Sequence, residues 1–325
     1  MIGYINCRAI SHIKGLELLL GDDACPISWK VNPNRLEFVA GWGRKKSAFI
    51  AKVYANFFKL PYLSLEDGFL RSCTLGVEGA APHSIIVDDL GIYFDATCSS
   101  RLEQIILDAS LCDALVDRAE NGIQLLRQYR LSKYNHAPEK HLKKGKSRHA
   151  VLVVDQTYGD ASVKLGMASP LYFTRMLQAA VQQNTDADIW VKMHPDVLAG
   201  KKKGYLLSVA KEFNCRIIAE DISPWSLFDQ VEKVYVVTSQ LGFEALIAGK
   251  EVHCFGMPFY AGWGLTHDQA TCNRRGVKRN LQQLFAAAYL LYPRYINPTT
   301  GLRCQFEDTV NNLLSEREKR RSGLE

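Results

Sequence analysis

Short hydrophobic runs alternate with longer amphipathic stretches along most of the chain. In the second half, five apolar runs predict buried strands, at 151–155, 189–193, 215–219, 233–237 and 252–255. Segments with helical spacing lie between them, at 170–183, 204–213, 224–231 and 242–249. This rhythm predicts a parallel sheet joined by right-handed helical crossovers.

The first half shows the same alternation with less regular runs. Strands are predicted at 36–43, at 61–69 and as two extended pieces within 84–95, and helices at 47–58 and 101–130. The polar, basic stretch 135–150 is typical of an interdomain linker. We therefore expect an α/β fold with Rossmann-like domains at 1–136 and 151–278 and a linker at 137–150. In the last part, 279–325, PRYINPTTG separates two helices expected to pack back on the first domain.

The composition is that of a soluble globular enzyme, with 325 residues of which 47% are hydrophobic and 23% charged. No stretch approaches the roughly 18 apolar residues of a membrane span, and the N-terminus lacks the features of a secretion signal. We expect a cytoplasmic protein. The nine cysteines include no C-x-x-C pair, so we expect reduced thiols and no zinc site.

The formal charge of +6 is concentrated in three basic runs, at 141–149, 200–204 and 317–321. These runs are either solvated surface or sites that attract an anionic membrane or an acidic glycan. Nucleic acid is not an expected partner, because no aromatic residues interleave with the basic ones.

The stretch VLVVDQTYGDASV (151–163) predicts a buried strand followed by a polar loop. Ligands of open α/β sheets bind beyond the carboxyl ends of the strands, so Gln156 and Asp160 are expected at the ligand-binding edge of the sheet. Asp160 is the candidate for chemistry. The alternative is that Asp160 only caps the following helical turn.

Two further strands end in polar residues. In IWVKMHPDV (189–197), the strand ends in Lys192, His194 and Pro195. The lysine cation and the imidazole suit a phosphate, unless they are a surface lysine and a structural histidine. VYVVTSQLGFEALIAG places the hydroxyls of Thr238 and Ser239 before a helix that begins near Leu241. Such a terminus favours an anion, although either hydroxyl could be a plain N-cap.

Three acidic groups remain to be placed. Glu244 follows in that helix and either binds ribose hydroxyls or compensates the helix dipole. Glu66 and Asp67 end a first-domain strand, where a carboxylate could act as a general acid or base, or EDG could be an ordinary turn. GWGRKKS (41–47) lacks the spacing of a phosphate loop. We expect no metal, because Asp186 and Asp188 precede their strand.

The ordered set LEDGF, VDQTYGDASV, VKMHPD, VVTSQLGFEALIAG, CFGMPFYAGWGLT and YPRYINPTTG resembles the capsule polysaccharide β-Kdo transferase family (KpsC). The resemblance runs from about Trp42 to Arg303. It implies a GT-B-type glycosyltransferase whose acceptor-side and CMP-sugar-binding domains face each other across a cleft. It also implies that this chain is an N-terminal module of a two-module protein.

The resemblance further implies CMP-Kdo as donor and a phosphatidylglycerol-type, lipid-linked Kdo acceptor at the cytoplasmic face of the inner membrane. Other capsule biosynthesis and export proteins would be partners. The family is retaining, so Asp160 would form a covalent sugar adduct and Glu66 would deprotonate the acceptor. Arg71 or Lys133 would bind the sugar carboxylate. The alternatives are a sialyltransferase-type enzyme, a nucleotide-sugar epimerase, disfavoured because no G-x-G-x-x-G follows a first strand, or a noncatalytic glycan-binding scaffold.

Overall fold

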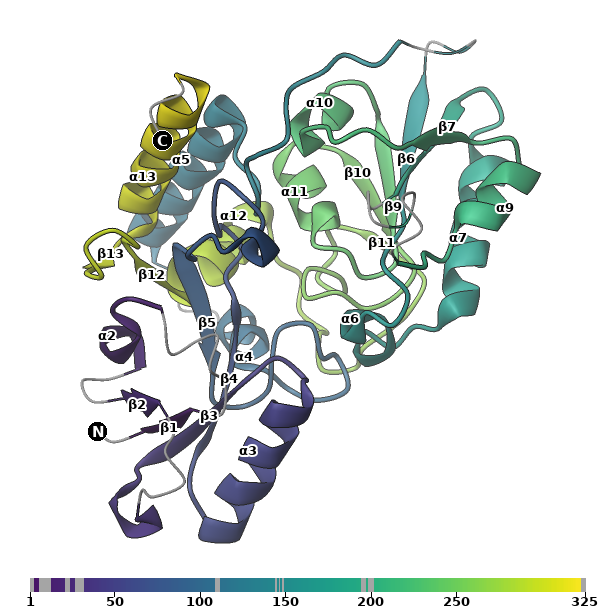
Figure 1. Cartoon of the computed structure of the whole chain (residues 1–325). Helices are drawn as coiled ribbons and strands as arrows, with labels where there is room; N and C mark the ends of the chain where they lie inside the picture. Colours follow the sequence, from purple (N-terminus) through teal and green to yellow (C-terminus); the bar gives the residue numbers. More distant parts are fainter. Residues whose placement is uncertain are drawn as a thin grey trace. The chain divides into compact units, whose positions relative to one another are not determined.

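The computed structural model describes residues 3–5, 13–20, 24–26, 32–108, 112–143, 145, 147, 149–193, 197 and 202–322. The chain forms two compact units (Figure 1). The first contains Met1–Ile92, Ser99–His136 and Phe285–Glu325, and the second contains Tyr93–Cys98 and Ala137–Leu284. Within the described residues, no helix is long and apolar enough to cross a membrane. The cysteines from Cys73 to Cys304 are free thiols.

The second unit is a six-stranded parallel sheet in the order β11-β10-β9-β6-β7-β8. Its strands are β6 Ala150–Val154, β7 Asp188–Lys192, β8 Arg216–Ile218, β9 Lys233–Val236, β10 Glu251–Cys254 and β11 His267–Asp268. Its helices are α6 Ala161–Leu165, α7 Pro170–Gln183, α9 Leu207–Glu212, α10 Pro224–Phe228 and α11 Leu241–Ile247. The five predicted strands and four predicted helices are confirmed.

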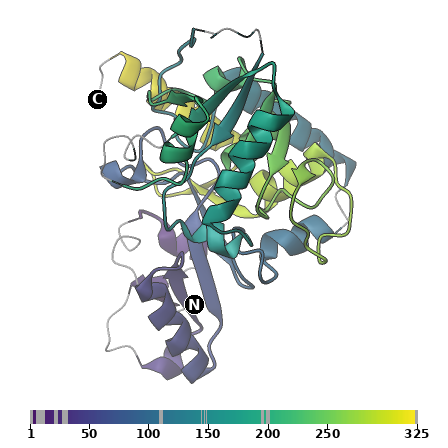
Figure 2. The ribbon, with the colours of Figure 1, turned by 90° about the vertical axis from the view of Figure 1, so that its right-hand side faces the viewer.

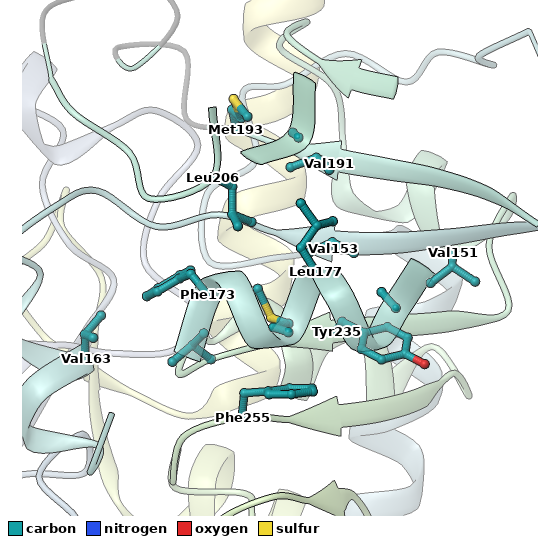
Figure 3. Close-up of a cluster of buried hydrophobic side chains, with 14 residues drawn as sticks. Val151, Val153, Val163, Phe173, Leu177, Val191, Met193, Leu206, Tyr235 and Phe255 are labelled. Carbon is teal, nitrogen blue, oxygen red and sulfur yellow. The ribbon is translucent and has the colours of Figure 1, made fainter. Parts of the chain in front are cut away.

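Apolar spacing explains how α7 packs on this sheet. Its buried residues Phe173, Met176, Leu177 and Ala180 recur every three or four positions, so they share one face of the helix. That face contributes to a core with Val153 of β6 and with residues of β7 and β9 (Figure 3). Figure 2 shows the teal helices of this unit in front of its strands. All five residues of β6 are buried, which holds the carboxyl end of this strand in a fixed position.

The first unit is a seven-stranded mixed sheet in the order β13-β12-β5-β4-β3-β1-β2. Its strands are β1 Gly3–Ile5, β2 Ala24–Pro26, β3 Phe38–Trp42, β4 Tyr62–Asp67, β5 Ser84–Asp88, β12 Pro293–Ile296 and β13 Arg303–Cys304. From β2 to β4 the pairs are parallel, and from β4 to β13 they are antiparallel. The prediction of a parallel sheet is therefore wrong at this edge. Only a 3-10 turn, Gly76–Glu78 (η2), lies between β4 and β5, so no α-helix carries the chain across the sheet.

Helices flank the first sheet and bring the end of the chain back to it. They are α2 Leu16–Leu20, α3 Lys46–Phe58, α4 Arg101–Leu107, α5 Asp113–Tyr129 and α13 Phe306–Arg321, with a 3-10 turn η1 at Pro33–Arg35. α12, Leu281–Phe285, runs into a π-helical turn η3, Ala286–Leu291. α13 packs beside α5, where the Arg118 guanidinium lies 2.8 Å from the Glu307 carboxylate.

Two predicted segments adopt other structures. PRYINPTTG is not merely a separator, because β12 begins at its proline and buries Tyr295 and Ile296 beside β5. The second extended piece predicted within 84–95 is a turn. The Asp88 carboxylate accepts hydrogen bonds from the backbone of Leu90, Gly91 and Arg101, and this ends β5 and redirects the chain.

The compact units also divide the chain differently from the predicted boundaries. Tyr93–Cys98 was predicted in the first domain and belongs to the second unit, where the Ala96 N–H donates to the Leu165 carbonyl. The predicted linker, 137–150, is also part of the second unit. The Pro138 carbonyl accepts from the Ser223 N–H, and β6 already begins at Ala150.

Candidate active site

Gln156 is the centre of a polar network at the carboxyl ends of β6 and β9. Its side chain is buried, and its Nε2 lies 3.3 Å from Asp160 Oδ2, 3.2 Å from Ser162 Oγ and 3.1 Å from Thr238 Oγ1. Its Oε1 accepts a hydrogen bond of 3.0 Å from the Thr238 N–H. Because β6 and β9 are neighbours in the sheet, one amide side chain fixes both loops. The structure thus brings together three predicted residues, Gln156, Asp160 and Thr238.

Asp160 is the N-cap of α6, and its Oδ1 accepts a 2.9 Å hydrogen bond from the Ser162 N–H. The capping alternative is therefore correct as a description of the local structure. The side chain is nevertheless exposed at the strand edge. Two donors, the Ser162 N–H and the Gln156 amide, hold the carboxylate in one orientation. An exposed and oriented carboxylate is what a nucleophile at this position requires.

Two glycines allow the loops to approach Thr238 closely. A Cβ atom on Gly166 would lie 2.4 Å from the Thr238 methyl group, and one on Gly256 would lie 2.8 Å from it. Both distances are too short for any side chain. The Thr238 hydroxyl also lies 3.1 Å from the Ser162 hydroxyl. Ser162 was not predicted, although its place two residues after Asp160 fits a capping turn.

Ser239 and Glu244, the other residues predicted around β9, lie at or just before the start of α11. Ser239 Oγ accepts a 3.3 Å hydrogen bond from the Leu241 N–H at the start of α11, and its carbonyl accepts a 2.5 Å bond from the Tyr260 hydroxyl. Glu244 is buried in the first turn of α11. Ser239 and Glu244 therefore stabilise the start of α11. Thr238 belongs to the Gln156 network beside Asp160.

Asp155, which the sequence analysis did not select, anchors the loop that carries Gln156. Its buried carboxylate accepts hydrogen bonds from the backbone of Gln156, Tyr205 and Leu206. Burial raises its pKa, and these backbone donors oppose that effect. The ring of Tyr205 in turn stacks on Phe173 at 4.0 Å. Asp155 therefore ties the loop after β6 to the core of the unit.

Lys192 ends β7, the strand on the other side of β6. Its Nζ donates a 2.7 Å hydrogen bond to the Glu220 carbonyl in the loop after β8. Burial lowers the pKa of its ammonium group, whereas Asp221 and Glu220 act to raise it. Lys192 is therefore placed at the predicted edge but already has a backbone partner. His194 and Pro195 lie outside the described residues.

A small pocket adjoins Thr238. It is open to solvent and is lined by Tyr93, Phe94, Thr238, Gln240, Pro258 and Phe259. The rings of Tyr93 and Phe259 meet edge to face at 5.9 Å. The sequence analysis missed this pocket because it assigned Tyr93 and Phe94 to a strand of the first domain. The glycine- and aromatic-rich run GMPFYAGWG (256–264) is the signal that could have indicated it.

In the first unit, Glu66 and Asp67 are the last two residues of β4, as predicted. The Glu66 carboxylate accepts a 3.1 Å hydrogen bond from the Asp67 N–H. Burial raises the pKa of Glu66, and the ammonium groups of Lys133 and Lys45 act in the opposite direction. A carboxylate with a raised pKa is suited to general acid/base work near neutral pH.

Arg71 and Lys133 lie near this strand end, and the structure distinguishes between them. The buried Arg71 guanidinium lies 2.7 Å from the Asp67 carboxylate and donates to the Ala80 carbonyl at 3.0 Å. Its backbone N–H donates to the Lys133 carbonyl. These contacts hold Arg71 at the end of β4, and its role at the sugar carboxylate stays a prediction. Lys133, whose ammonium acts on Glu66, keeps that candidate role.

Away from these residues, one group of potential metal ligands occurs in the described part of the chain, formed by Glu251, His253 and His267. The Glu251 carboxylate lies 2.7 Å from His253 Nε2 and 3.6 Å from the Lys233 ammonium. The lysine opposes cation binding by like-charge repulsion. β10 begins at Glu251, so the group is nearer the opposite edge from the Gln156 network. The expectation that the site needs no metal stays a prediction.

A family model described as capsule polysaccharide biosynthesis protein matches residues 37–295. The chain belongs to this family. The matched range contains every candidate residue from Glu66 to Glu244. The predicted family resemblance is confirmed.

Two curated members resemble most of this chain. It is 45% identical over 328 residues to the capsule polysaccharide modification protein LipA of Neisseria meningitidis serogroup B, covering 97% of this chain and 46% of LipA. It is 40% identical over 271 residues to the lipopolysaccharide-processing protein LpsZ of Rhizobium meliloti, covering 82% of this chain and 62% of LpsZ. The chain spans about half the length of LipA.

Two solved structures share the fold. Thermosulfurimonas dismutans KpsC, beta Kdo 2,4 transferase, has a TM-score of 0.88 and 46% identity, covering 96% of this chain and 97% of that one. Thermosulfurimonas dismutans KpsC, beta Kdo 2,7 transferase, has a TM-score of 0.74 and 30% identity, covering 97% and 99%. The predicted α/β fold of the GT-B type is thereby confirmed.

Proposed function

We propose that the chain is a retaining β-Kdo glycosyltransferase that uses CMP-Kdo and extends a lipid-linked Kdo acceptor of the phosphatidylglycerol type. The observation that carries the proposal is the Gln156 network, which presents the exposed Asp160 carboxylate beside Thr238 at the carboxyl end of the sheet. Similarity to two KpsC β-Kdo transferases supports the same sugar class.

CMP would bind at the edge formed by β6 and β9. The Thr238 hydroxyl and neighbouring backbone groups would contact the phosphate, together with Lys192 and with His194 and Pro195. The aromatic pocket beside Thr238, lined by Tyr93 and Phe259, offers apolar faces on which the cytosine or sugar ring can stack. Lys133 would pair with the carboxylate of Kdo. No metal is required in this scheme, because the charge that develops as CMP leaves falls on a single phosphate group, which the donors named above would contact.

The reaction would proceed by two displacements. In the first, an Asp160 oxygen attacks the anomeric carbon while the bond to the CMP phosphate breaks, and the electron pair leaves with CMP. In the second, an acceptor hydroxyl attacks the same carbon, its proton passes to Glu66 and the Asp160 carboxylate departs. Two inversions give net retention. The proposal requires both carboxylates to act on the same sugar, although they belong to different units of the chain.

We further propose a β-2,4 linkage. The chain is 46% identical to the KpsC 2,4 transferase and 30% identical to the 2,7 transferase, and the TM-scores follow the same order. Acceptor position is a property of the site and not of the fold, so this order favours the 2,4 linkage without defining the contacts that select it.

The deciding experiment is incubation of the chain with CMP-Kdo and a synthetic Kdo-glycolipid. We expect release of CMP that depends on the acceptor, and a product whose new linkage is β-2,4 by nuclear magnetic resonance. No CMP release would favour a noncatalytic scaffold. Release from CMP-sialic acid but not from CMP-Kdo would favour a sialyltransferase-type enzyme.

A pH profile tests the role of Glu66 as the base. The base must be deprotonated when the acceptor attacks, so kcat/KM for the acceptor should fall as the pH falls through the pKa of Glu66, which burial raises. Lys133→Met removes the strongest charge that lowers this pKa. The acidic limb of the profile should therefore move to higher pH in this variant.

Lys45→Met is the matched control, because Lys45 acts on the same carboxylate in the same direction but more weakly. A smaller shift to higher pH is expected. If Lys133→Met raises KM for CMP-Kdo and leaves the acidic limb in place, Lys133 only binds the sugar and Glu66 is not the titrating base.

A further inference from the structure

The helix α3 packs with its apolar face reversed. Its buried residues are Ala48, Ala51 and Ala55, which pack toward the first sheet. Except for Tyr54, which packs with Ala51 and Ala55, its large apolar residues are exposed. An amphipathic helix of a soluble protein normally buries the large apolar residues and exposes polar ones. On α3, the small alanine side chains face the sheet. The exposed large apolar side chains of this helix are therefore not part of that contact.

Four of these outward residues form one stripe, made of Phe49, Ile50, Val53 and Phe57. Their exposed fractions are 70%, 49%, 51% and 78%. Helical spacing places all four within about one third of the helix circumference, directly opposite the three alanines. Isolated exposed apolar residues are normal, but two phenylalanines and two aliphatic residues on one face mark a binding surface.

The charges around this α3 stripe have one sign. The segment 44–59 contains Arg44, Lys45, Lys46, Lys52 and Lys59 and no acidic residue, and all five basic residues are exposed. Aromatic and aliphatic residues on one face with basic residues around them are the composition of helices that lie in the plane of a membrane. Basic residues near an anionic bilayer add a long-range attraction.

The beginning of α3 is next to the end of β4. The Gly43 N–H donates a 2.8 Å hydrogen bond to the Leu65 carbonyl. A Cβ atom on Gly43 would lie 3.0 Å from Glu66 Oε2. The turn that leads into the α3 stripe therefore contacts the side chain to which we assign acceptor deprotonation.

We propose that the α3 stripe docks on an anionic phospholipid surface and thereby holds Glu66 where a lipid-linked acceptor is presented. The role of bringing Glu66 to a lipid-linked acceptor rests on the proposed function. The exposed stripe and the basic residues around it do not depend on that function. A second copy of the chain is the less favourable occupant, because two facing α3 helices would bring basic residues of like charge together. The helix is about 20 Å long at 1.5 Å per residue, sufficient for an in-plane anchor.

The test is co-sedimentation of the chain with vesicles of phosphatidylglycerol and phosphatidylcholine, and with phosphatidylcholine alone. We expect binding to the anionic vesicles that weakens with added salt. Phe49→Ser/Phe57→Ser should weaken it by tenfold or more, and Phe49→Leu/Phe57→Leu should largely retain it. The matched control is Leu171→Ser/Leu302→Ser, which removes two exposed apolar residues elsewhere (52% and 61% exposed) and should bind as the unmodified chain does.

Each result has a separate meaning. Equal vesicle binding by Phe49→Ser/Phe57→Ser and the unmodified chain would overturn the proposal. So would a dimer, seen by light scattering, that dissociates in this variant, because the stripe would then cover a second copy. CMP release with a water-soluble Kdo acceptor should be unchanged in the variant. If the unmodified chain binds vesicles through the stripe but releases no CMP, the proposed function fails while the docking surface stands.

Discussion

Asp160→Asn is expected to reduce Kdo transfer by roughly 10³-fold or more, as removal of a covalent nucleophile does in other enzymes. The substitution separates the two roles of this residue. Asparagine caps a helix about as well as aspartate, so the hydrogen bond to the Ser162 N–H that begins α6 should persist. What is lost is the carboxylate that attacks the sugar, together with the hydrogen bond from Gln156 to Oδ2, because the asparagine amide has only one acceptor oxygen. Transfer is measured as CMP released and as glycolipid formed.

Two controls give this result its meaning. CMP affinity, measured by calorimetry, should change little, because the lost group acts at the anomeric carbon and not on the nucleotide. Asp160→Ala should be equally inactive but also less stable by about 0.5–2 kcal/mol, the usual cost of an N-cap. If Asp160→Asn transfers Kdo at a normal rate, Asp160 is a cap only, and the nucleophile must be sought elsewhere at this edge.

The architecture of the second unit could be predicted because each element carries its own signal. β6 is apolar at every position, and α7 repeats apolar residues at helical spacing. The first unit was harder, because its sheet depends on pairing distant in sequence. β12 lies beside β5 although about two hundred residues separate them, and no local pattern encodes such a pairing. The aromatic Tyr295 and the β-branched Ile296 of β12 suggest a strand only once a neighbouring strand is known.

The candidate site was also predictable only in part. The strand pattern predicted that Asp160, Gln156, Thr238 and Glu66 lie at or just beyond the carboxyl ends of their strands, as they do, because a parallel strand delivers its next residues to one edge of the sheet. Side-chain partners were not predictable. Arg71 seemed free to bind a carboxylate, but the neighbouring Asp67 already pairs with it at 2.7 Å. The aromatic pocket includes Tyr93 from a segment that was predicted in the first domain but belongs to the second unit, as Thr238 does.

Glu66→Gln should stop the reaction after the first displacement. Glutamine has the shape of glutamate, and its carbonyl can still accept from the Asp67 N–H, so the end of β4 should keep its structure. The amide cannot take the acceptor proton, and loss of a general base costs typically 10²–10⁴-fold. CMP should therefore appear in a burst equal to the enzyme present. Mass spectrometry should find one Kdo on the peptide that contains Asp160.

Azide provides the decisive control for Glu66→Gln, because this anion carries no proton to remove and should discharge the Kdo adduct without a base. Added azide should restore CMP turnover in Glu66→Gln and have little effect on Asp160→Asn, which forms no adduct. A Glu66→Gln variant that gives neither burst nor azide rescue would place Glu66 in donor binding or folding. Normal glycolipid synthesis by the variant would leave the EDG triplet as a turn and assign acceptor deprotonation to another residue.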